Sequence, residues 1–377
     1  MEDSLCGHQG REESILDMGS LGWRPLLERH FEQYSLEGYS AGRIAGEHLH
    51  LYRVYAEQGE FVARVSGKMR HDAQGRRDYP AIGDWVAFSL SARGPGAQGP
   101  GMRGEAVIHA VLPRRSKFSR KVAGRTTEEQ VLAANIDTVF LMTALNRDFN
   151  LRRVERYLAL AWDSGANPVI LLSKTDLCED VEGWTAEVEQ VALGVPVHPI
   201  CSLSGDGLDA LSPYLGYGKT VAVLGSSGVG KSTLINALIG DGVQSTGTIR
   251  EADDRGRHTT SSRRLLALPA GGYIIDTPGL RELALWCTAD SLDRTFADID
   301  SYAGECRFTD CSHRTEPGCA VLQALDEGLL DRARYDSYMR LQRELAHLTQ
   351  KGDRREYLSG KKKEKQMSRL IKAFYKK

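Results

Sequence analysis

One glycine-rich segment constrains the fold of this chain more than any other feature: Gly225-Ser226-Ser227-Gly228-Val229-Gly230-Lys231-Ser232-Thr233. Its spacing is G-x-x-x-x-G-K-S, and it lies between the apolar run Thr220–Leu224 and the helix-periodic stretch Leu234–Ile239. In that setting the backbone N–H groups of the loop and the N-terminus of the helix point at phosphate oxygens. The sequence therefore predicts a phosphate-binding loop in an α/β domain, with Lys231 on the β and γ phosphates and Ser232 as a Mg²⁺ ligand.

Two further motifs, each at the end of an apolar run, predict how a nucleotide is recognised. Asp276-Thr277-Pro278-Gly279 offers a carboxylate that holds a water on Mg²⁺ and a final glycine that senses the γ phosphate. Ser173-Lys174-Thr175-Asp176 resembles the N-K-x-D motif of GTPases, in which the aspartate pairs with guanine and the lysine stem lies along the base. Ser173 replaces the usual asparagine and shortens the contact that supports the base, but Asp176 is retained. The sequence therefore favours GTP over ATP.

The order of these motifs differs from that of ordinary GTPases, in which the phosphate loop comes first. Here Lys174 and Asp176 precede Gly225 by about fifty residues. Between them, Cys201-Ser202-Leu203-Ser204 ends another strand and resembles the S-A-K type motif, whose backbone N–H contacts the guanine carbonyl, which assigns Ser202 to the nucleotide site. We therefore expect a circularly permuted GTPase domain.

Four metal-binding side chains lie within fourteen residues of the C-terminal part: Cys306, Cys311, His313 and Cys319. Three thiolates and one imidazole form the ligand set of a closed, tetrahedral, structural zinc site. The alternative is a group of buried free cysteines beside a surface histidine. The chain has seven cysteines, and an odd number disfavours a disulfide framework. We expect one structural Zn²⁺.

Changes in hydrophobic periodicity divide the chain into five parts. We assign 1–38 to an N-terminal extension of unassigned role, 39–122 to an all-β, OB-like RNA-binding barrel, 123–284 to the α/β GTPase domain, 285–350 to an α-rich zinc-binding domain, and 351–377 to a basic tail. The Gly- and Pro-rich stretch 91–104 is expected to be a loop between two strands of the barrel.

Composition limits the location and partners of the protein. Of its 377 residues 41% are hydrophobic and 26% are charged, as in soluble globular proteins. No stretch has the 18 or more consecutive apolar residues of a membrane span, and the N-terminus lacks a signal pattern, so we expect a cytoplasmic protein without a membrane partner. We also expect a monomer. The net charge of −1 hides two basic runs, 114–125 and 351–377, which can neutralise phosphates or simply face solvent.

An OB-like barrel, a permuted GTPase domain and a C-x4-C-x-H-x5-C module in that order resemble the ribosome small-subunit-dependent GTPase A family, also called RsgA or YjeQ. The resemblance covers roughly 38–346. It implies an enzyme that binds the small ribosomal subunit and its rRNA late in assembly, hydrolyses GTP to GDP and phosphate when the subunit stimulates it, and then leaves. Mg²⁺ accompanies the GTP, and the two basic runs become rRNA contacts.

The resemblance also bears on how water is activated. Leu280 stands where Ras-like enzymes carry the glutamine that positions the attacking water, so intrinsic hydrolysis should be slow. The segment Arg255–Thr260 resembles the first switch of the family, where a threonine closes on Mg²⁺. We assign that role to Thr259, beside Thr260, and propose His258 as the residue that positions the water.

Two other functions remain open from the sequence. An RNA-modification or large-subunit assembly GTPase shares the phosphate chemistry but does not need an N-terminal barrel paired with a C-terminal zinc module. The second is an RNA-binding scaffold, in which the nucleotide only locks a conformation. Leu280 and Ser173 favour this function.

Overall fold

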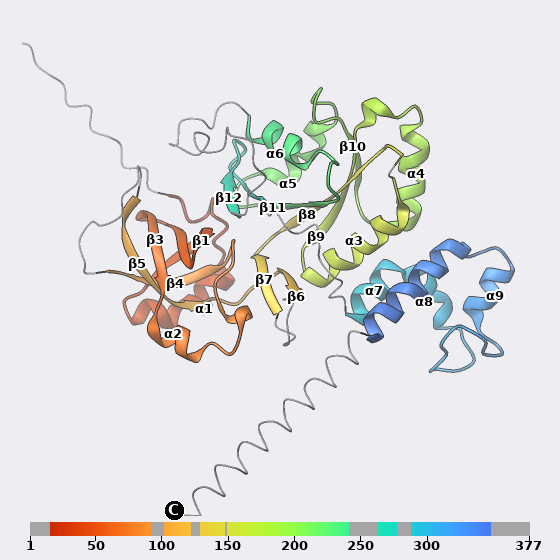
Figure 1. Ribbon diagram of the computed structural model, residues 1–377, viewed down its shortest axis with the longest axis horizontal. Coiled ribbons are helices and arrows are strands. Elements are labelled where there is room, and N and C mark those ends of the chain that lie inside the picture. The colour runs from red at the N-terminus through yellow and green to blue at the C-terminus, as the bar shows by residue number, and fades with distance from the viewer. Residues whose placement is uncertain are drawn as a thin grey trace, which may run out of the picture.

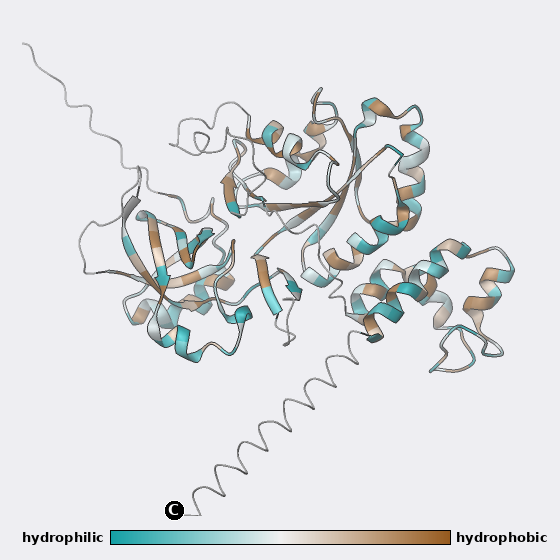
Figure 2. Ribbon diagram, in the orientation of Figure 1, coloured by the Kyte–Doolittle hydropathy of each residue, from teal (hydrophilic) through white to brown (hydrophobic). Residues whose placement is uncertain are grey.

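The computed structural model describes residues 16–91, 102–121, 129–147, 149–240, 263–276 and 288–347. It consists of an N-terminal barrel, a central α/β layer and a C-terminal group of helices, which follow one another across Figure 1. In Figure 2 apolar residues run along the strands, whereas the helices mix polar and apolar residues. No helix within the described ranges is long and apolar enough to cross a membrane.

The N-terminal barrel confirms the predicted all-β region. Its strands are β1 (Ser40–His48), β2 (Leu51–Ala56), β3 (Gly59–Val65), β4 (Trp85–Leu90) and β5 (Met102–Val111). They pair in the order β1-β2-β3-β5-β4, and β1 also pairs with β4, which closes the barrel. Burial alternates along β2 and β3 because successive side chains point to opposite faces of a strand. The helix α2 (Gly67–Asp72) and the 3-10 turn Arg76–Asp78 connect β3 to β4.

The central layer is a mostly parallel sheet, as the alternating strand and helix pattern predicts. Its strands are β8 (Thr138–Ala144), β9 (Asn167–Ser173), β10 (Val197–Ile200), β11 (Thr220–Gly225), β12 (Arg264–Ala267) and β13 (Tyr273–Asp276). The order is β10-β9-β8-β11-β13-β12, with only β12 antiparallel to its neighbour β13. Both β8 and β11 are buried along their whole length, as strands covered on both faces must be.

Helices and short turns connect these strands. They are α3 (Leu151–Ser164), the 3-10 turn Thr175–Leu177, α4 (Val181–Val191), the 3-10 turn Leu208–Leu211, α5 (Ser212–Leu215) and α6 (Lys231–Ile239). A separate two-stranded sheet of β6 (Lys117–Lys121) and β7 (Glu129–Ala134) lies between the barrel and the central layer. The barrel and the central layer also share a sheet, because β1 pairs with β12.

The N-terminal region contributes a helix to which the sequence assigned no role. The helix α1 (Pro25–Leu36) packs on the barrel, where the indole of Trp23 meets that of Trp85 edge to face at 4.9 Å between ring centroids. Arg24 forms an ion pair with Asp137, directly before β8, at 2.6 Å. The N-terminal region therefore contacts both the barrel and the central layer.

A buried arginine of β1 joins these parts. Its side chain is 1% exposed, and its guanidinium group donates to four oxygens, those of Leu21 O, Gly83 O, Asn135 O and Thr220 Oγ1. This residue is Arg43. Burial lowers the pKa of Arg43 to about 10, while nearby Asp137 opposes the shift, so the group stays charged at neutral pH.

The C-terminal group of helices docks on α3 through α7 (Ala289–Thr295) and through Arg334. Its other helices are α8 (Ala297–Ala303), α9 (Ala320–Asp326) and the helical residues 332–347. Arg334 donates to Asp298 through two nitrogens at 2.5 and 2.6 Å, and reaches Glu155 of α3 at 3.1 Å. Glu155 is fully buried, and burial raises its pKa while contacts with Ser337, Arg152 and Arg334 oppose the rise.

This buried pair predicts a large effect of one substitution. Arg334→Met leaves Glu155 buried without its cross-domain partner, so we expect the free energy of unfolding to fall by about 3 to 5 kcal/mol. Urea denaturation of the full chain, followed by tryptophan fluorescence, measures the change. The matched control is Arg332→Met, which breaks an exposed pair with Asp336 and should cost below about 1 kcal/mol. Equal losses in the two variants would contradict the role of the buried pair.

Candidate nucleotide site and metal centre

The predicted phosphate loop joins β11 to α6 at the carboxyl edge of the central sheet. Gly225 approaches β8 so closely that a Cβ there would lie 2.4 Å from Met142 O, and only glycine fits. Gly230, directly before α6, has φ +100°, a conformation that side chains disfavour. The two glycines therefore set the path of the loop, and the N-terminus of α6 faces the space where an anion is stabilised.

The charged and hydroxyl groups of the loop lie at the start of α6. The Lys231 ammonium group donates to Gly225 O at 2.8 Å, which places it across the loop. Ser232 is exposed at the first turn of α6, and Thr233 beside it is half-buried. The remaining loop residues are Ser226, Ser227, Gly228 and Val229, of which only Val229 is buried.

Asp276 lies at the same edge of the sheet. It ends β13, which runs parallel to β11 with Ala222 opposite Ile275, and it is exposed where that strand leaves the sheet. A carboxylate at this place can act on a magnesium ion next to the phosphate loop. The other residues assigned to magnesium and water, His258, Thr259, Thr260 and Gly279, lie outside the described residues, as does Leu280.

The predicted guanine motif follows β9, two strands from β11. Ser173 ends that strand, Lys174 has a left-handed backbone with φ 61°, and Thr175–Leu177 forms a 3-10 turn that carries Asp176. The Cys201 thiol, at the end of neighbouring β10, lies 3.3 Å from Asp176 Oδ1 and donates to it. The structure therefore brings the Ser173–Asp176 motif and the Cys201–Ser204 motif together around the carboxylate of Asp176.

Ser173 performs a task that the motif alone did not reveal. Its buried hydroxyl lies 2.8 Å from Val229 O of the phosphate loop and 3.2 Å from Thr143 O. The shorter side chain thus still ties the guanine motif to the phosphate loop. The Ser202 hydroxyl, two residues beyond the end of β10, is buried and has no hydrogen-bond partner within the described part of the chain. Such an orphaned group fits a site that a bound base would complete.

One further contact to the loop was missing from the sequence prediction. Arg153, in the first turn of α3, reaches Ser226 Oγ at 3.4 Å. No motif marks this arginine. Its position in the chain, in the helix that follows β8, was the available signal. Strand β8 lies beside β11, and residues that follow neighbouring parallel strands meet at one edge of the sheet.

The four predicted metal ligands converge in the C-terminal part. Their ligand atoms all lie within 4.8 Å of one another. His313 Nδ1 is 3.6 Å from Cys306 Sγ and 3.5 Å from Cys319 Sγ, and the two sulfurs are 3.9 Å apart. A tetrahedral ion with bonds to sulfur of about 2.3 Å gives sulfur–sulfur edges of about 3.8 Å. The group, which includes Cys311, can therefore hold a metal ion.

The backbone around the ligands explains how two of them fit so close together in sequence. His313 has φ 57°, the tight turn that lets it approach beside Cys311, and its carbonyl accepts a hydrogen bond from Tyr335 Oη at 2.6 Å. Glu316 accepts from the backbone N–H groups of Ser312, Arg314 and Thr315 and closes the loop. Burial raises the pKa of the Cys319 thiol, which favours its protonated form. A bound cation would instead favour the thiolate.

Two arginines of the first basic run have structural partners. Arg114 forms two hydrogen bonds with the buried Asp84, at 2.8 and 2.7 Å, and Arg115 pairs with Asp137 at 2.5 Å. Lys117 pairs with Glu129 at 2.7 Å. Within the described residues this run therefore stabilises the fold, whereas Arg125 and the basic tail lie outside them.

Comparison with known proteins places these features in one family. The sequence profile of the RsgA GTPase matches residues 111–286. A relative in Opitutus terrae, named small ribosomal subunit biogenesis GTPase RsgA, is 48% identical over 90% of this chain and 92% of its own. The chain belongs to the RsgA GTPase family. A relative of the same name in Methanosarcina acetivorans is 44% identical over 88% of this chain and 86% of its own.

Solved structures agree with the RsgA assignment. YjeQ from Thermotoga maritima matches with a TM-score of 0.61 and 26% identity, over 82% of this chain and 99% of that protein. YloQ, described as a circularly permuted GTPase, matches with a TM-score of 0.58 and 25% identity, over 82% and 96%. The predicted family, the permuted fold and the GTPase activity are thereby confirmed.

The contact between Ser173 and Val229 predicts a measurable loss of nucleotide affinity. Ser173→Ala removes the hydroxyl and leaves a buried carbonyl with less support, so GDP binding should weaken by about five- to tenfold. Titration with a fluorescent GDP analogue measures this. Ser204→Ala, at an exposed serine of the adjacent motif, is the control and should bind as the unmodified chain does. Unchanged affinity in Ser173→Ala would refute the proposed support.

Proposed function

We propose that this enzyme binds the small ribosomal subunit late in its assembly, hydrolyses GTP to GDP and phosphate when the subunit stimulates it, and then dissociates. The observation that carries the proposal is the combination in one chain of a permuted GTPase site, a closed five-stranded barrel and a Cys3His cluster. Relatives that match most of the chain are named for biogenesis of the small ribosomal subunit, which supports the same role here. We further propose that it acts as a cytoplasmic monomer.

The chain supplies binding and orientation to this reaction. Lys231 and the loop N–H groups hold the β and γ phosphates, and Lys174 and Asp176 hold guanine. Ser232 and Asp276, with Thr259, would hold the magnesium ion, which would neutralise charge that develops on the phosphates. His258 positions the water in place of the glutamine that Leu280 replaces. The sequence motif supports this last role, since His258 lies outside the described residues.

The metal in the Cys3His cluster is proposed to be zinc. Three thiolates and one imidazole favour Zn²⁺, and all four tetrahedral positions are filled by protein, so the ion is structural. The barrel and the basic tail are proposed to contact rRNA, mainly through its shape and phosphates.

GTP turnover with purified ribosomal subunits tests the function. The small subunit should raise the turnover rate by at least about tenfold, whereas the large subunit should leave it at the intrinsic level. Absence of stimulation by either subunit would refute the proposal, and stimulation by the large subunit alone would favour the alternative assembly role.

The same assay tests His258. His258→Ala should lose most of the stimulated rate while binding GTP and the small subunit with unchanged affinity. Lys231→Ala should instead lose nucleotide binding, which separates the two roles. If His258→Ala keeps the stimulated rate, another residue positions the water.

Metal content tests the zinc centre. Cys311→Ser removes one of four ligands, so the bound zinc measured by elemental analysis should fall from one per chain to a small fraction. The melting temperature should fall with it, because the loop closes around the ion. Cys178→Ser, a free thiol outside the cluster, should keep the zinc. Retention of zinc in Cys311→Ser would show that Cys311 is not a ligand.

A further inference from the structure

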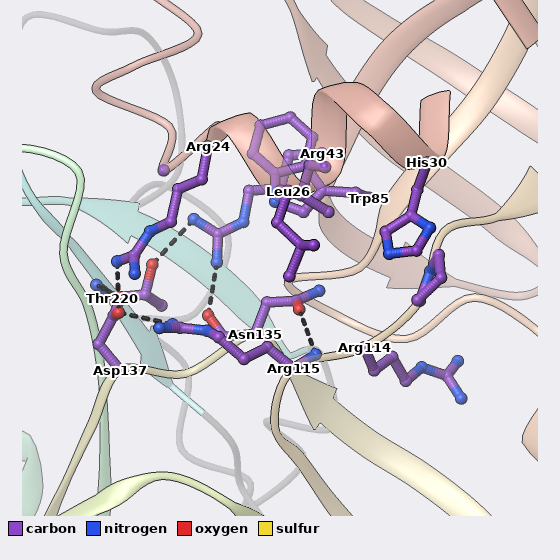
Figure 3. A pocket seen from close by; sticks show the side chains of 13 residues that line it. Arg24, Leu26, His30, Arg43, Trp85, Arg114, Arg115, Asn135, Asp137 and Thr220 are labelled. Carbon is purple, nitrogen blue, oxygen red and sulfur yellow. Dashed lines mark hydrogen bonds and ion pairs between the residues drawn. The ribbon is translucent and has the colours of Figure 1, made fainter. Parts of the chain in front are cut away.

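A cavity of about 120 Å³ lies where α1, the barrel and the central sheet meet. Figure 3 shows Arg24, Arg115 and Asp137 gathered on one side and His30 on the other, with Leu26 between them. The volume admits several water molecules and therefore also a group as large as phosphate.

Two guanidinium groups at this cavity are held by one carboxylate. Asp137 Oδ1 accepts from Arg24 at 2.6 Å and from Arg115 at 2.5 Å, and its other oxygen accepts from Thr220 N at 2.8 Å. Within the described residues, neither arginine side chain donates to any other group. Because a guanidinium group carries five N–H donors, most of the donors remain open to a ligand. The two side chains are 40% and 43% exposed, so a ligand can reach them.

The cavity has an excess of positive charge. The cavity lining has three arginines, Arg24, Arg43 and Arg115, but only the one carboxylate of Asp137 to balance their charge. The fourth arginine, Arg114, is neutralised by Asp84. The buried Arg43 guanidinium donates only to carbonyl and hydroxyl oxygens within the described residues, so its charge is not paired directly. An anion in the cavity would offset this excess.

The cavity is separate from the nucleotide site. It touches Thr220 at the amino end of β11, whereas the phosphate loop begins at Gly225 at the other end. Five residues of extended strand span about 17 Å. A ligand here therefore does not compete with GTP for space.

We propose that this cavity is a second anion site, which binds a phosphate group between the guanidinium groups of Arg24 and Arg115. Arginine favours phosphate because its planar donors pair with two oxygens at once, and the shared carboxylate holds both arginines in place before the ligand arrives. The phosphate belongs either to the backbone of a single-stranded RNA or to a free phosphorylated small molecule. The site is independent of the proposed ribosomal function, because phosphate binding here needs no subunit.

Calorimetric titration of the full chain tests the site, with a nonhydrolysable GTP analogue in excess so that the phosphate loop is filled. The probes are inorganic phosphate, adenosine monophosphate and a short oligouridine. The double variant Arg24→Gln with Arg115→Gln should weaken binding of the phosphate probes by about tenfold or more. Arg29→Gln, on α1 but away from the cavity, is the control and should change nothing.

A second variant leaves the ion pairs intact. Leu26→Trp places a larger side chain at the cavity wall and should also weaken binding, while the affinity for the GTP analogue and the melting temperature stay near those of the unmodified chain. If the variants bind both oligouridine and inorganic phosphate more weakly, the phosphate comes from RNA. If the variants bind only the small probes more weakly, it comes from a free phosphorylated molecule. Absence of phosphate binding at millimolar concentration, or equal binding in all variants, would overturn the proposal.

Discussion

The buried guanidinium group of Arg43 is the interaction on which the arrangement of the N-terminal barrel and the central layer depends. Its four acceptors belong to four separate segments of the chain, at Leu21, Gly83, Asn135 and Thr220. Because a buried charge without hydrogen bonds is costly, these segments must stay together for the charge to stay inside. One side chain thereby couples the N-terminal region, the barrel and the sheet that carries the phosphate loop.

Strand β11 connects the segments around Arg43 to the phosphate loop. Its first residue, Thr220, bonds to Arg43 and to Asp137, and its last, Gly225, begins the phosphate loop. The strand is buried throughout and lies between β8 and β13, so the loop cannot shift independently of its neighbours. The nucleotide site and the proposed second anion site therefore lie at opposite ends of one rigid strand, β11.

Helix α3 connects the nucleotide site to the C-terminal part that contains the Cys3His cluster. Its first turn places Arg153 at the phosphate loop and Arg152 at Asp331 of the C-terminal part. One turn later, the buried Glu155 meets Arg334. The Cys3His loop thus rests on helices that are fixed to a helix in direct contact with the nucleotide loop, a physical connection between the two that the order of the motifs does not suggest.

The sequence by itself determined the sites whose chemistry is local. Phosphate loop, guanine motif and Cys3His cluster are each built from residues close together in the chain, so spacing and residue type predicted them, and the order of the motifs predicted the permutation. Only the tertiary structure decided the contacts between distant segments: Ser173 with Val229, Arg334 with Glu155, and the group around Arg43. The bonded residues in these three groups are 22 to 179 positions apart in the sequence. No spacing or periodicity records such pairs, because burial and charge pairing arise only when the chain has brought the partners together.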